Sequence, residues 1–120
     1  MNVDRILSDI KGRMMEDIVL LETKIANPKK QVFQLQFAVG EFDMVVADNV
    51  NATCEIYEVK HSKEQAKEQY RHLIDEEKLK STEFRYGKIK KKVVIYYGEN
   101  ATLENGIEYR NVEEYLKSLV

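Results

Sequence analysis

The segment Gly40–Lys60, GEFDMVVADNVNATCEIYEVK, decides how this chain folds. Residues Glu41–Ala47 and Cys54–Lys60 are rich in amino acids that favour strands. Between them, Asp48–Ala52 consists mainly of amino acids that favour turns. The segment therefore predicts two strands that are joined by a turn.

Side chains alternate between the two faces of a strand, so the pattern also predicts which residues lie together. The second strand is expected to carry four residues on one face: Cys54, Ile56, Glu58 and Lys60. The first strand is expected to carry four as well: Glu41, Asp43, Val45 and Ala47. If the strands pair as a hairpin, Asp43, Glu58 and Lys60 can converge at one end.

Two carboxylates beside a lysine suggest a metal site. Carboxylate oxygens are hard ligands that suit Mg²⁺ or Mn²⁺. Such a metal can polarise a phosphodiester and generate hydroxide from bound water. A lysine next to it can orient that water or stabilise charge that develops on the phosphate. The alternative is that Glu58 and Lys60 are ordinary charged residues on a solvated sheet face.

Asp43 followed by Glu58-Val59-Lys60 resembles the PD-(D/E)xK nuclease superfamily, in which an acidic residue on one strand precedes an E-x-K on the next. Phe42 stands where this pattern usually has proline. The resemblance implies a restriction-endonuclease-like core in which Asp43, Glu58 and the Val59 carbonyl bind Mg²⁺ or Mn²⁺. It also implies catalytic roles for Asp43, Glu58 and Lys60.

The N-terminal segment from Val3 to about Ala26 is predicted to be a long amphipathic helix that ends at Asn27-Pro28. Its apolar residues recur at helical spacing: Val3, Ile6, Leu7, Ile10, Met14, Ile18, Leu21 and Ile25. Gly12–Glu16 resembles the G-x-x-x-E helix that precedes the catalytic hairpin in C-terminal domains of prokaryotic AAA-type ATPases. That resemblance implies that Glu16 adds a metal ligand. Alternatively Glu16 is solvated, since it lies roughly 150° from the centre of the apolar stripe.

Val32–Phe37 is predicted to be a half-exposed strand. Ser62–Gln65 has the pattern of a capping box, which predicts a helix that runs to about Lys80. In the superfamily this helix often turns polar residues toward the site, and Gln65 and Gln69 are the candidates here. Neither His61 nor His72 is expected to act in catalysis.

The remaining third of the chain begins with a polar connection, Ser81–Lys92, whose lysines are either solvated or contact phosphate groups. Val93–Tyr97 is predicted to be an interior strand, because its apolar run is continuous. Asn105-Gly106 predicts a turn before a small strand at Ile107–Tyr109. A terminal helix is expected to begin near Asn111.

Composition limits the function further. The chain has 120 residues, which suggests one domain, and a net charge of −2, which counts against tight nucleic-acid binding by this chain alone. One cysteine, Cys54, excludes an internal disulfide and is expected to pack in the core. We expect a cytoplasmic protein, a setting that the single cysteine fits. No apolar run approaches the roughly 20 residues that span a bilayer. No P-loop motif occurs.

These patterns predict an α/β (α+β) domain over residues 1–120 with the order αβββαβ(β)α and a mixed central sheet flanked by helices. The predicted function is that of a metal-dependent nuclease-like domain acting on DNA or another nucleic acid. The family resemblance implies either the C-terminal part of an AAA-type ATPase or a stand-alone relative. The alternative is a catalytically inactive interaction module on the same fold, which docks DNA or an attached or partner ATPase domain.

Overall fold

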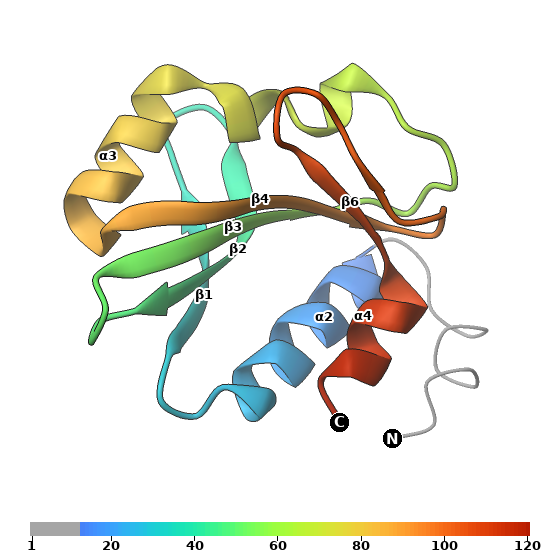
Figure 1. The fold of residues 1–120 in the computed structure, drawn as a ribbon, viewed down its shortest axis with the longest axis horizontal. Coiled ribbons are helices and arrows are strands. Elements are labelled where there is room, and N and C mark those ends of the chain that lie inside the picture. The colour runs from blue at the N-terminus through green and yellow to red at the C-terminus, as the bar shows by residue number, and fades with distance from the viewer. Residues whose placement is uncertain (1–12) are drawn as a thin grey trace.

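A computed structural model describes residues 13–120 of the chain and has a six-stranded sheet at its centre, in the order β1-β2-β3-β4-β6-β5 (Figure 1). The strands are β1 (Gln31–Gln36), β2 (Glu41–Asp48), β3 (Thr53–Val59), β4 (Lys88–Tyr96), β5 (Ala101–Thr102) and β6 (Glu108–Asn111). The helices are α2 (Arg13–Ala26), α3 (Glu76–Tyr86) and α4 (Val112–Ser118). The predicted mixed α/β architecture is thus confirmed, while the part of the predicted first helix before Arg13 lies outside the described residues.

The sheet changes from antiparallel to parallel pairing at its middle. Strands β1, β2 and β3 form an antiparallel meander, whereas β3 pairs with β4, and β4 with β6, in parallel. A parallel pair needs a crossover connection. Between β3 and β4 this crossover consists of two 3₁₀ turns, η1 (Lys67–Gln69) and η2 (Arg71–Ile74), and of α3.

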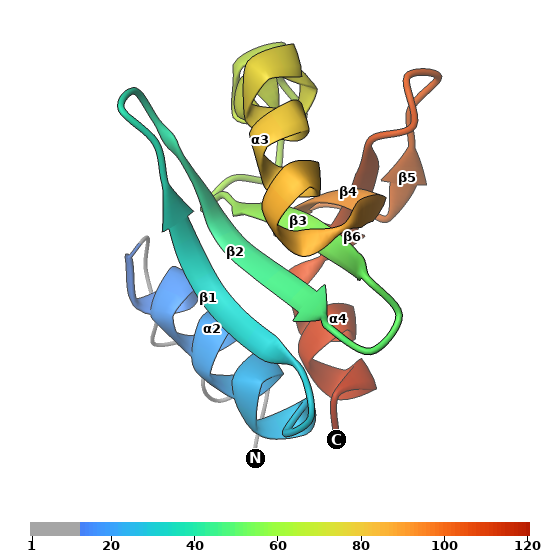
Figure 2. The same ribbon diagram turned by 90° about the vertical axis from the view of Figure 1, so that its left-hand side faces the viewer.

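Helices cover both faces of the sheet, as predicted. Figure 2 shows α2 and α4 on one side of the strands and α3 on the other. The core on the α2–α4 side contains Met15, Val19, Val32, Met44, Val46, Tyr57, Val59, Val93, Ile95, Val112, Tyr115 and Leu116. The core on the α3 side contains Leu35, Phe42, Val45, Ala47, Cys54, Ile56, Leu73, Val94, Tyr96, Ile107 and Tyr109.

Helix α2 buries a different face from the predicted one. Met15, Val19 and Thr23 are buried, and Thr23 hydrogen-bonds to Tyr115 of α4 at 2.6 Å. The predicted apolar stripe is largely exposed instead, at Met14 (56%), Leu21 (55%) and Ile25 (63%). The helix therefore has two apolar faces, and the face that carries Met15 and Val19 packs against the sheet.

The predicted helix from Ser62 to Lys80 is wrong. The Ser62 carbonyl accepts a hydrogen bond from the Tyr97 backbone N–H at 2.8 Å, which holds Ser62 beside the end of β4. Asp75 caps α3 instead, because its side chain accepts hydrogen bonds from the Glu77 and Lys78 backbone N–H groups. The predicted connection at Ser81–Lys92 is likewise wrong, since it contains the end of α3 and the beginning of β4.

The predicted interior strand and terminal helix are present, whereas the predicted small strand at Ile107–Tyr109 is β6 (Glu108–Asn111) and β5 was not predicted. Val93–Tyr96 is buried within β4, and Asn111 caps α4 by accepting a hydrogen bond from the Glu114 N–H. Cys54 is buried, and burial raises the pKa of its thiol to about 11. Within residues 13–120, none of the helices has the length and hydropathy needed to cross a membrane.

Candidate carboxylate site

An irregularity in the β1–β2 pairing shapes the candidate site. Phe33 pairs with Val45 but Leu35 pairs with Phe42, so Gln34 alone lies opposite both Asp43 and Met44. This is a β-bulge, which re-aims side chains and interrupts alternation. Phe42 therefore joins Val45 in the α3-side core. The prediction that Asp43 simply shares a face with Val45 and Ala47 does not allow for this bulge.

Asp43 lies where β2 and β3 stop pairing. The register between the two strands ends at Met44–Tyr57. Beyond it the Asp43 Oδ2 atom accepts a hydrogen bond from the Val59 backbone N–H at 2.8 Å. The carboxylate thus takes the place of a strand partner, and this contact holds Asp43 at 7% exposure between the two strands.

Three carboxylates converge on the α2 side of this point. One oxygen each from Glu16, Glu41 and Asp43 lies within 4.8 Å of the others. The Gln34 side-chain amide donates hydrogen bonds to Glu16, at 3.3 Å, and to Glu41. Burial, followed by the negative charges of Asp43 and Glu41, raises the pKa of Glu16. Glu16 is therefore directed at the sheet and is partly buried, although its hydrogen bond to Gln34 stays accessible to solvent.

Glu58 approaches Asp43 from the other side of the sheet. Its neighbours Tyr57 and Val59 belong to the α2–α4 core, so Glu58 faces the α3 side. It is 2% exposed, and its Oε1 atom is enclosed with no hydrogen-bond partner among the described residues. Burial, followed by hydrogen bonding to and the charge of Asp43, raises the pKa of Glu58 to about 9. Without a bound cation, this shift favours the protonated form of Glu58.

Lys60 supplies the positive charge at this site. Its Nζ atom lies 3.5 Å from Glu58 Oε2, and its side chain is 37% exposed. The Lys60 backbone N–H donates to the Ile95 carbonyl at 2.8 Å, which fixes the residue just past the end of β3. The ammonium group therefore reaches both the buried Glu58 and solvent.

The structure brings the predicted residues Glu16 and Asp43 together with Glu41, whereas Glu58 and Lys60 form a separate ion pair on the α3 side of the sheet. Asp43 connects the two groups, because its negative charge raises the pKa of both Glu16 and Glu58. Glu41, which the sequence predicts on the same strand face as Asp43, also lies in the carboxylate cluster. Gln34 was not among the predicted site residues. The signal for it was its place on the strand that pairs with the acidic segment Glu41–Asp43.

The four lysines Lys88, Lys90, Lys91 and Lys92 lie at different distances from the carboxylates along the sheet. Lys88 pairs with Thr53 at the start of β3 and Lys92 with Ile56 at its middle, whereas Asp43 contacts Val59 at its end. At about 3.3 Å per residue these separations along the strand are roughly 20 Å for Lys88 and roughly 10 Å for Lys92. Phosphate contact by Lys88 would therefore be remote from the carboxylates.

Four polar residues of the crossover segment have other contacts. Gln65 donates to the Tyr96 hydroxyl at 3.2 Å, and Gln69 accepts from the Tyr109 hydroxyl at 2.8 Å, so both anchor the crossover to the sheet. His61 lies with its ring 5.0 Å from that of Tyr97. His72 packs on the β1–β2 turn at Gly40. The contacts of Gln65 and Gln69 therefore give no support to the prediction that these residues turn toward the site.

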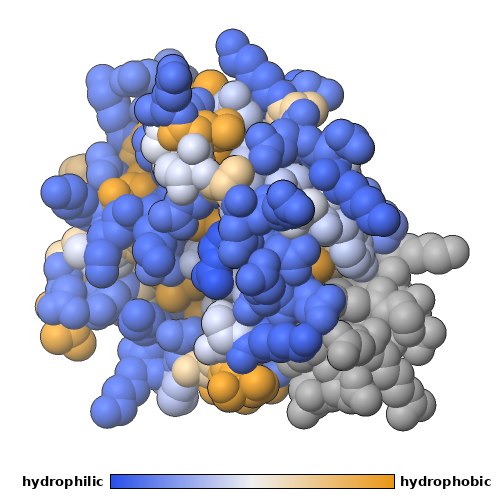
Figure 3. All heavy atoms as spheres, turned by 45° about the vertical axis from the view of Figure 1, so that its right-hand side comes forward, coloured by the Kyte–Doolittle hydropathy of each residue, from blue (hydrophilic) through white to orange (hydrophobic). Residues whose placement is uncertain are grey.

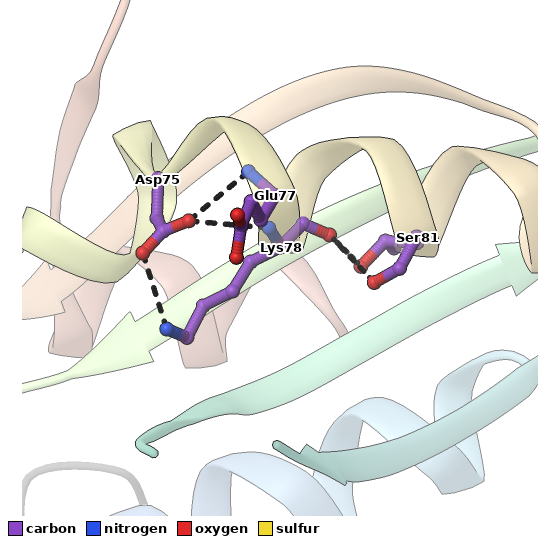
Figure 4. Close-up of polar contacts among 5 residues, drawn as sticks. Asp75, Glu77, Lys78 and Ser81 are labelled. Atoms are coloured by element: carbon purple, nitrogen blue, oxygen red, sulfur yellow. Dashed lines mark hydrogen bonds and ion pairs between the residues drawn. The ribbon is translucent and has the colours of Figure 1, made fainter. Parts of the chain in front are cut away.

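The surface has a separate hollow of about 380 Å³ between the β1–β2 turn and α3. Its lining consists of Phe37, Ala38, Val39, Asp75, Glu77, Lys78 and Ser81, and Figure 4 shows the polar contacts of the α3 residues. None of them is a predicted site residue. On the face drawn in Figure 3, hydrophilic residues predominate and apolar atoms form small separate areas.

Comparison with known proteins assigns no relationship. No family model matches the chain, and neither the curated proteins nor the solved structures contain a significant match.

Proposed function

We propose that this chain is a metal-dependent nuclease-like domain of the restriction-endonuclease-like type, which hydrolyses phosphodiester bonds in nucleic acid. The observation that carries the proposal is the convergence of Glu16, Glu41 and Asp43 beside the unpartnered Glu58 oxygen. Burying carboxyl groups costs free energy unless a partner compensates. A divalent cation is the partner that suits a set made only of carboxylate oxygens.

The donor set fits Mg²⁺ or Mn²⁺. Carboxylates bind these ions at about 2.0–2.2 Å, so ligands on opposite sides of one ion are about 4.2 Å apart. The separation of up to 4.8 Å among Glu16, Glu41 and Asp43 is close to that span. Asp43 would connect this cluster to the buried Glu58, which lies outside the cluster and would bind the ion as its carboxylate. Gln34 would orient Glu16 and Glu41 from outside the ion.

The chemistry follows from these positions. A bound divalent cation supplies Lewis acidity toward a phosphodiester oxygen and lowers the pKa of bound water. Lys60 is exposed enough to reach a substrate and close enough to Glu58 to be held in place. Its ammonium group would orient the attacking water and stabilise negative charge on the phosphate. Asp43 is held against Val59 N–H, which fixes the carboxylate before any ligand arrives.

Calorimetric titration with Mn²⁺ tests the proposal. We expect the wild type to bind Mn²⁺ and Asp43→Asn to lose the binding, because Asp43 is common to both groups of carboxylates. Glu41→Gln serves as the matched variant, since it neutralises a more exposed carboxylate of the same cluster. Loss in Asp43→Asn with weakened binding in Glu41→Gln would locate the ion on the α2 side of the sheet. Absence of binding to the wild type, both alone and with added DNA, would contradict the proposal.

The exposed stripe on α2 favours a second candidate, an inactive interaction module. Met14, Leu21 and Ile25 are each more than half exposed on one side of the helix. Exposed apolar residues that gather on one surface mark contact sites for partners. In that case α2 would dock an attached or partner ATPase domain, and the carboxylates would bind no metal. The same Mn²⁺ titration distinguishes the two candidates.

A further inference from the structure

Helix α2 presents an apolar stripe to solvent. Met14, Leu21 and Ile25 are 56%, 55% and 63% exposed, and the partly buried Ile18 lies between them on the helix surface. The buried face of α2, centred on Val19, lies roughly 130° further round the helix. The exposed stripe is therefore additional to the face that holds α2 on the sheet.

The spacing of the four stripe residues is that of a coiled-coil seam. From Met14 through Ile18 and Leu21 to Ile25 the intervals are four, three and four residues. This spacing puts methionine and leucine at the d positions of a heptad and isoleucine at both a positions. Such a seam is narrower than the apolar face with which a helix covers a sheet, and it fits one other helix. A second copy of α2 supplies a helix with the same seam.

The charges beside the stripe fit a second copy of α2 that runs in the antiparallel direction. Asp17 and Lys24 are exposed at the two g positions, along the edge of the stripe that faces away from the sheet. Neither has an ion-pair partner among residues 13–120. In an antiparallel pair each Asp17 lies opposite the Lys24 of the second copy, and two-fold symmetry makes this contact twice. A parallel pair would place Asp17 opposite Glu22, and these like charges repel.

We propose that the chain forms a two-fold symmetric dimer through an antiparallel pair of α2 helices. Met14 of one copy packs beside Ile25 of the other, and the two copies of Ile18 and Leu21 form the centre of the contact. The two pairs between Asp17 and Lys24 close its outer edge. This arrangement is isologous, since both copies use the same surface.

The dimer leaves the carboxylate cluster accessible. Glu16 lies on nearly the opposite side of α2 from the stripe, where it accepts a hydrogen bond from Gln34 of β1. The inference therefore does not rest on the proposed function, and it gives the stripe an occupant other than an ATPase domain. Helix α2 has 14 residues and is about 21 Å long, so the contact is smaller than that of a permanent dimer. We expect dissociation in the micromolar range.

Sedimentation velocity of the full chain over a range of micromolar concentrations tests the proposal. We expect the wild type to shift from monomer to dimer as the concentration rises. Leu21→Lys should stay monomeric, because it puts a charge at the centre of the seam. Phe84→Lys is the matched control and should dimerise like the wild type, since Phe84 is 93% exposed on α3, outside the stripe. Circular dichroism verifies that both variants fold. Loss of the dimer in Phe84→Lys but not in Leu21→Lys would overturn the proposal.

Charge reversal determines the direction of the two helices. Asp17→Lys and Lys24→Asp are each expected to weaken the dimer roughly tenfold, because each turns two attractive pairs into repulsive ones. An equimolar mixture of the two variants should restore the dimer, since every pair between unlike copies is again oppositely charged. Dimers that neither reversal weakens, or that Asp17→Lys strengthens, would overturn the antiparallel contact. A wild type that stays monomeric would overturn the dimer itself and assign the stripe to the N-terminal segment or to another protein.

Discussion

The two ends of the β3–β4 pair carry charge in opposite ways. At the end near Val59, Asp43 and Glu58 are buried at 7% and 2% exposure. At the end near Thr53, the β4 residues Lys88, Lys90 and Lys91 are exposed. Buried carboxyl groups are costly without compensation, whereas exposed lysines cost little. The difference teaches that a cluster of charged residues in the sequence indicates a functional site less well than the burial of charged side chains in the structure does.

The lysine end has a structural reason to be charged. β6 pairs with β4 only from Val93 to Tyr96, so the first half of β4 extends beyond it. Lysines on such a strand edge discourage pairing with other chains. The cluster that looked like a phosphate-binding feature in the sequence is explained by this role, and the carboxylate end is left as the functional candidate.

The largest expected effect is a loss of cleavage activity when a lysine at the carboxylate end is removed, but not when a lysine at the other end is removed. Lys60→Ala should lower the rate of Mg²⁺-dependent cleavage at least about 100-fold, because it removes a group that stabilises charge on the phosphate. Lys91→Ala should leave the rate unchanged. The measurement is the single-turnover rate on a labelled duplex, with circular dichroism to verify that both variants fold. Retained cleavage in Lys60→Ala would exclude the proposed mechanism.

The next effect uses the raised pKa of Glu58. An acid whose pKa rises from 4.5 to about 9 on folding gives stability that is fully present below about pH 4.5 and lost as the pH rises through 9. Without divalent metal, the free energy of unfolding should therefore fall by up to about 1.4 kcal/mol per pH unit between these values. Glu58→Gln should remove this slope, because the amide stays neutral.

Urea unfolding of both proteins at several pH values between 5 and 9, in the presence of a chelator, measures the effect. Glu16 titrates in both proteins and so serves as an internal control. Identical slopes for wild type and Glu58→Gln would mean that Glu58 is ionised in the folded protein, and the carboxylate end would then resemble the exposed lysine end.

The comparison also explains what the sequence could predict. The hairpin around Asp48–Ala52, the buried half of β4 and the Asn111 cap depend on neighbours in the chain, and all three were predicted. The buried face of α2 depends on which of two apolar stripes meets the sheet, and periodicity cannot choose between Met14 and Met15. Ser62 has the local pattern of a helix cap, but the tertiary hydrogen bond from Tyr97 to its carbonyl overrides that pattern.

The candidate site divides in the same way. Strand period and hairpin pairing predicted that Asp43, Glu58 and Lys60 can converge, and the pairing of Lys60 with Glu58 follows from their places on one strand face. The role of Gln34 and the position of Glu41 in the cluster depend on the bulge at Asp43 and Met44. A bulge is one extra residue in one strand, and nothing in the alternation of this segment marks where it falls.

The smallest expected effect concerns the glycines at the two ends. Gly87, beside the lysines, has φ +93°, and an added Cβ would lie 1.9 Å from the Ala52 carbonyl oxygen. Gly40, beside the carboxylates, has φ +83°, and its Cβ would meet the His72 ring. Both alanine variants incur roughly 1–2 kcal/mol for the left-handed backbone. Gly87→Ala should cost more, because backbone cannot move aside as a side chain can.

Thermal unfolding of the two variants measures this difference, with Gly106→Ala as control, since that glycine has φ +87° and open space around it. We expect the order Gly87→Ala, Gly40→Ala, Gly106→Ala from the least to the most stable. Equal stability of the Gly40 and Gly106 variants would mean that the His72 ring yields freely and that the carboxylate end does not depend on its contact with the β1–β2 turn.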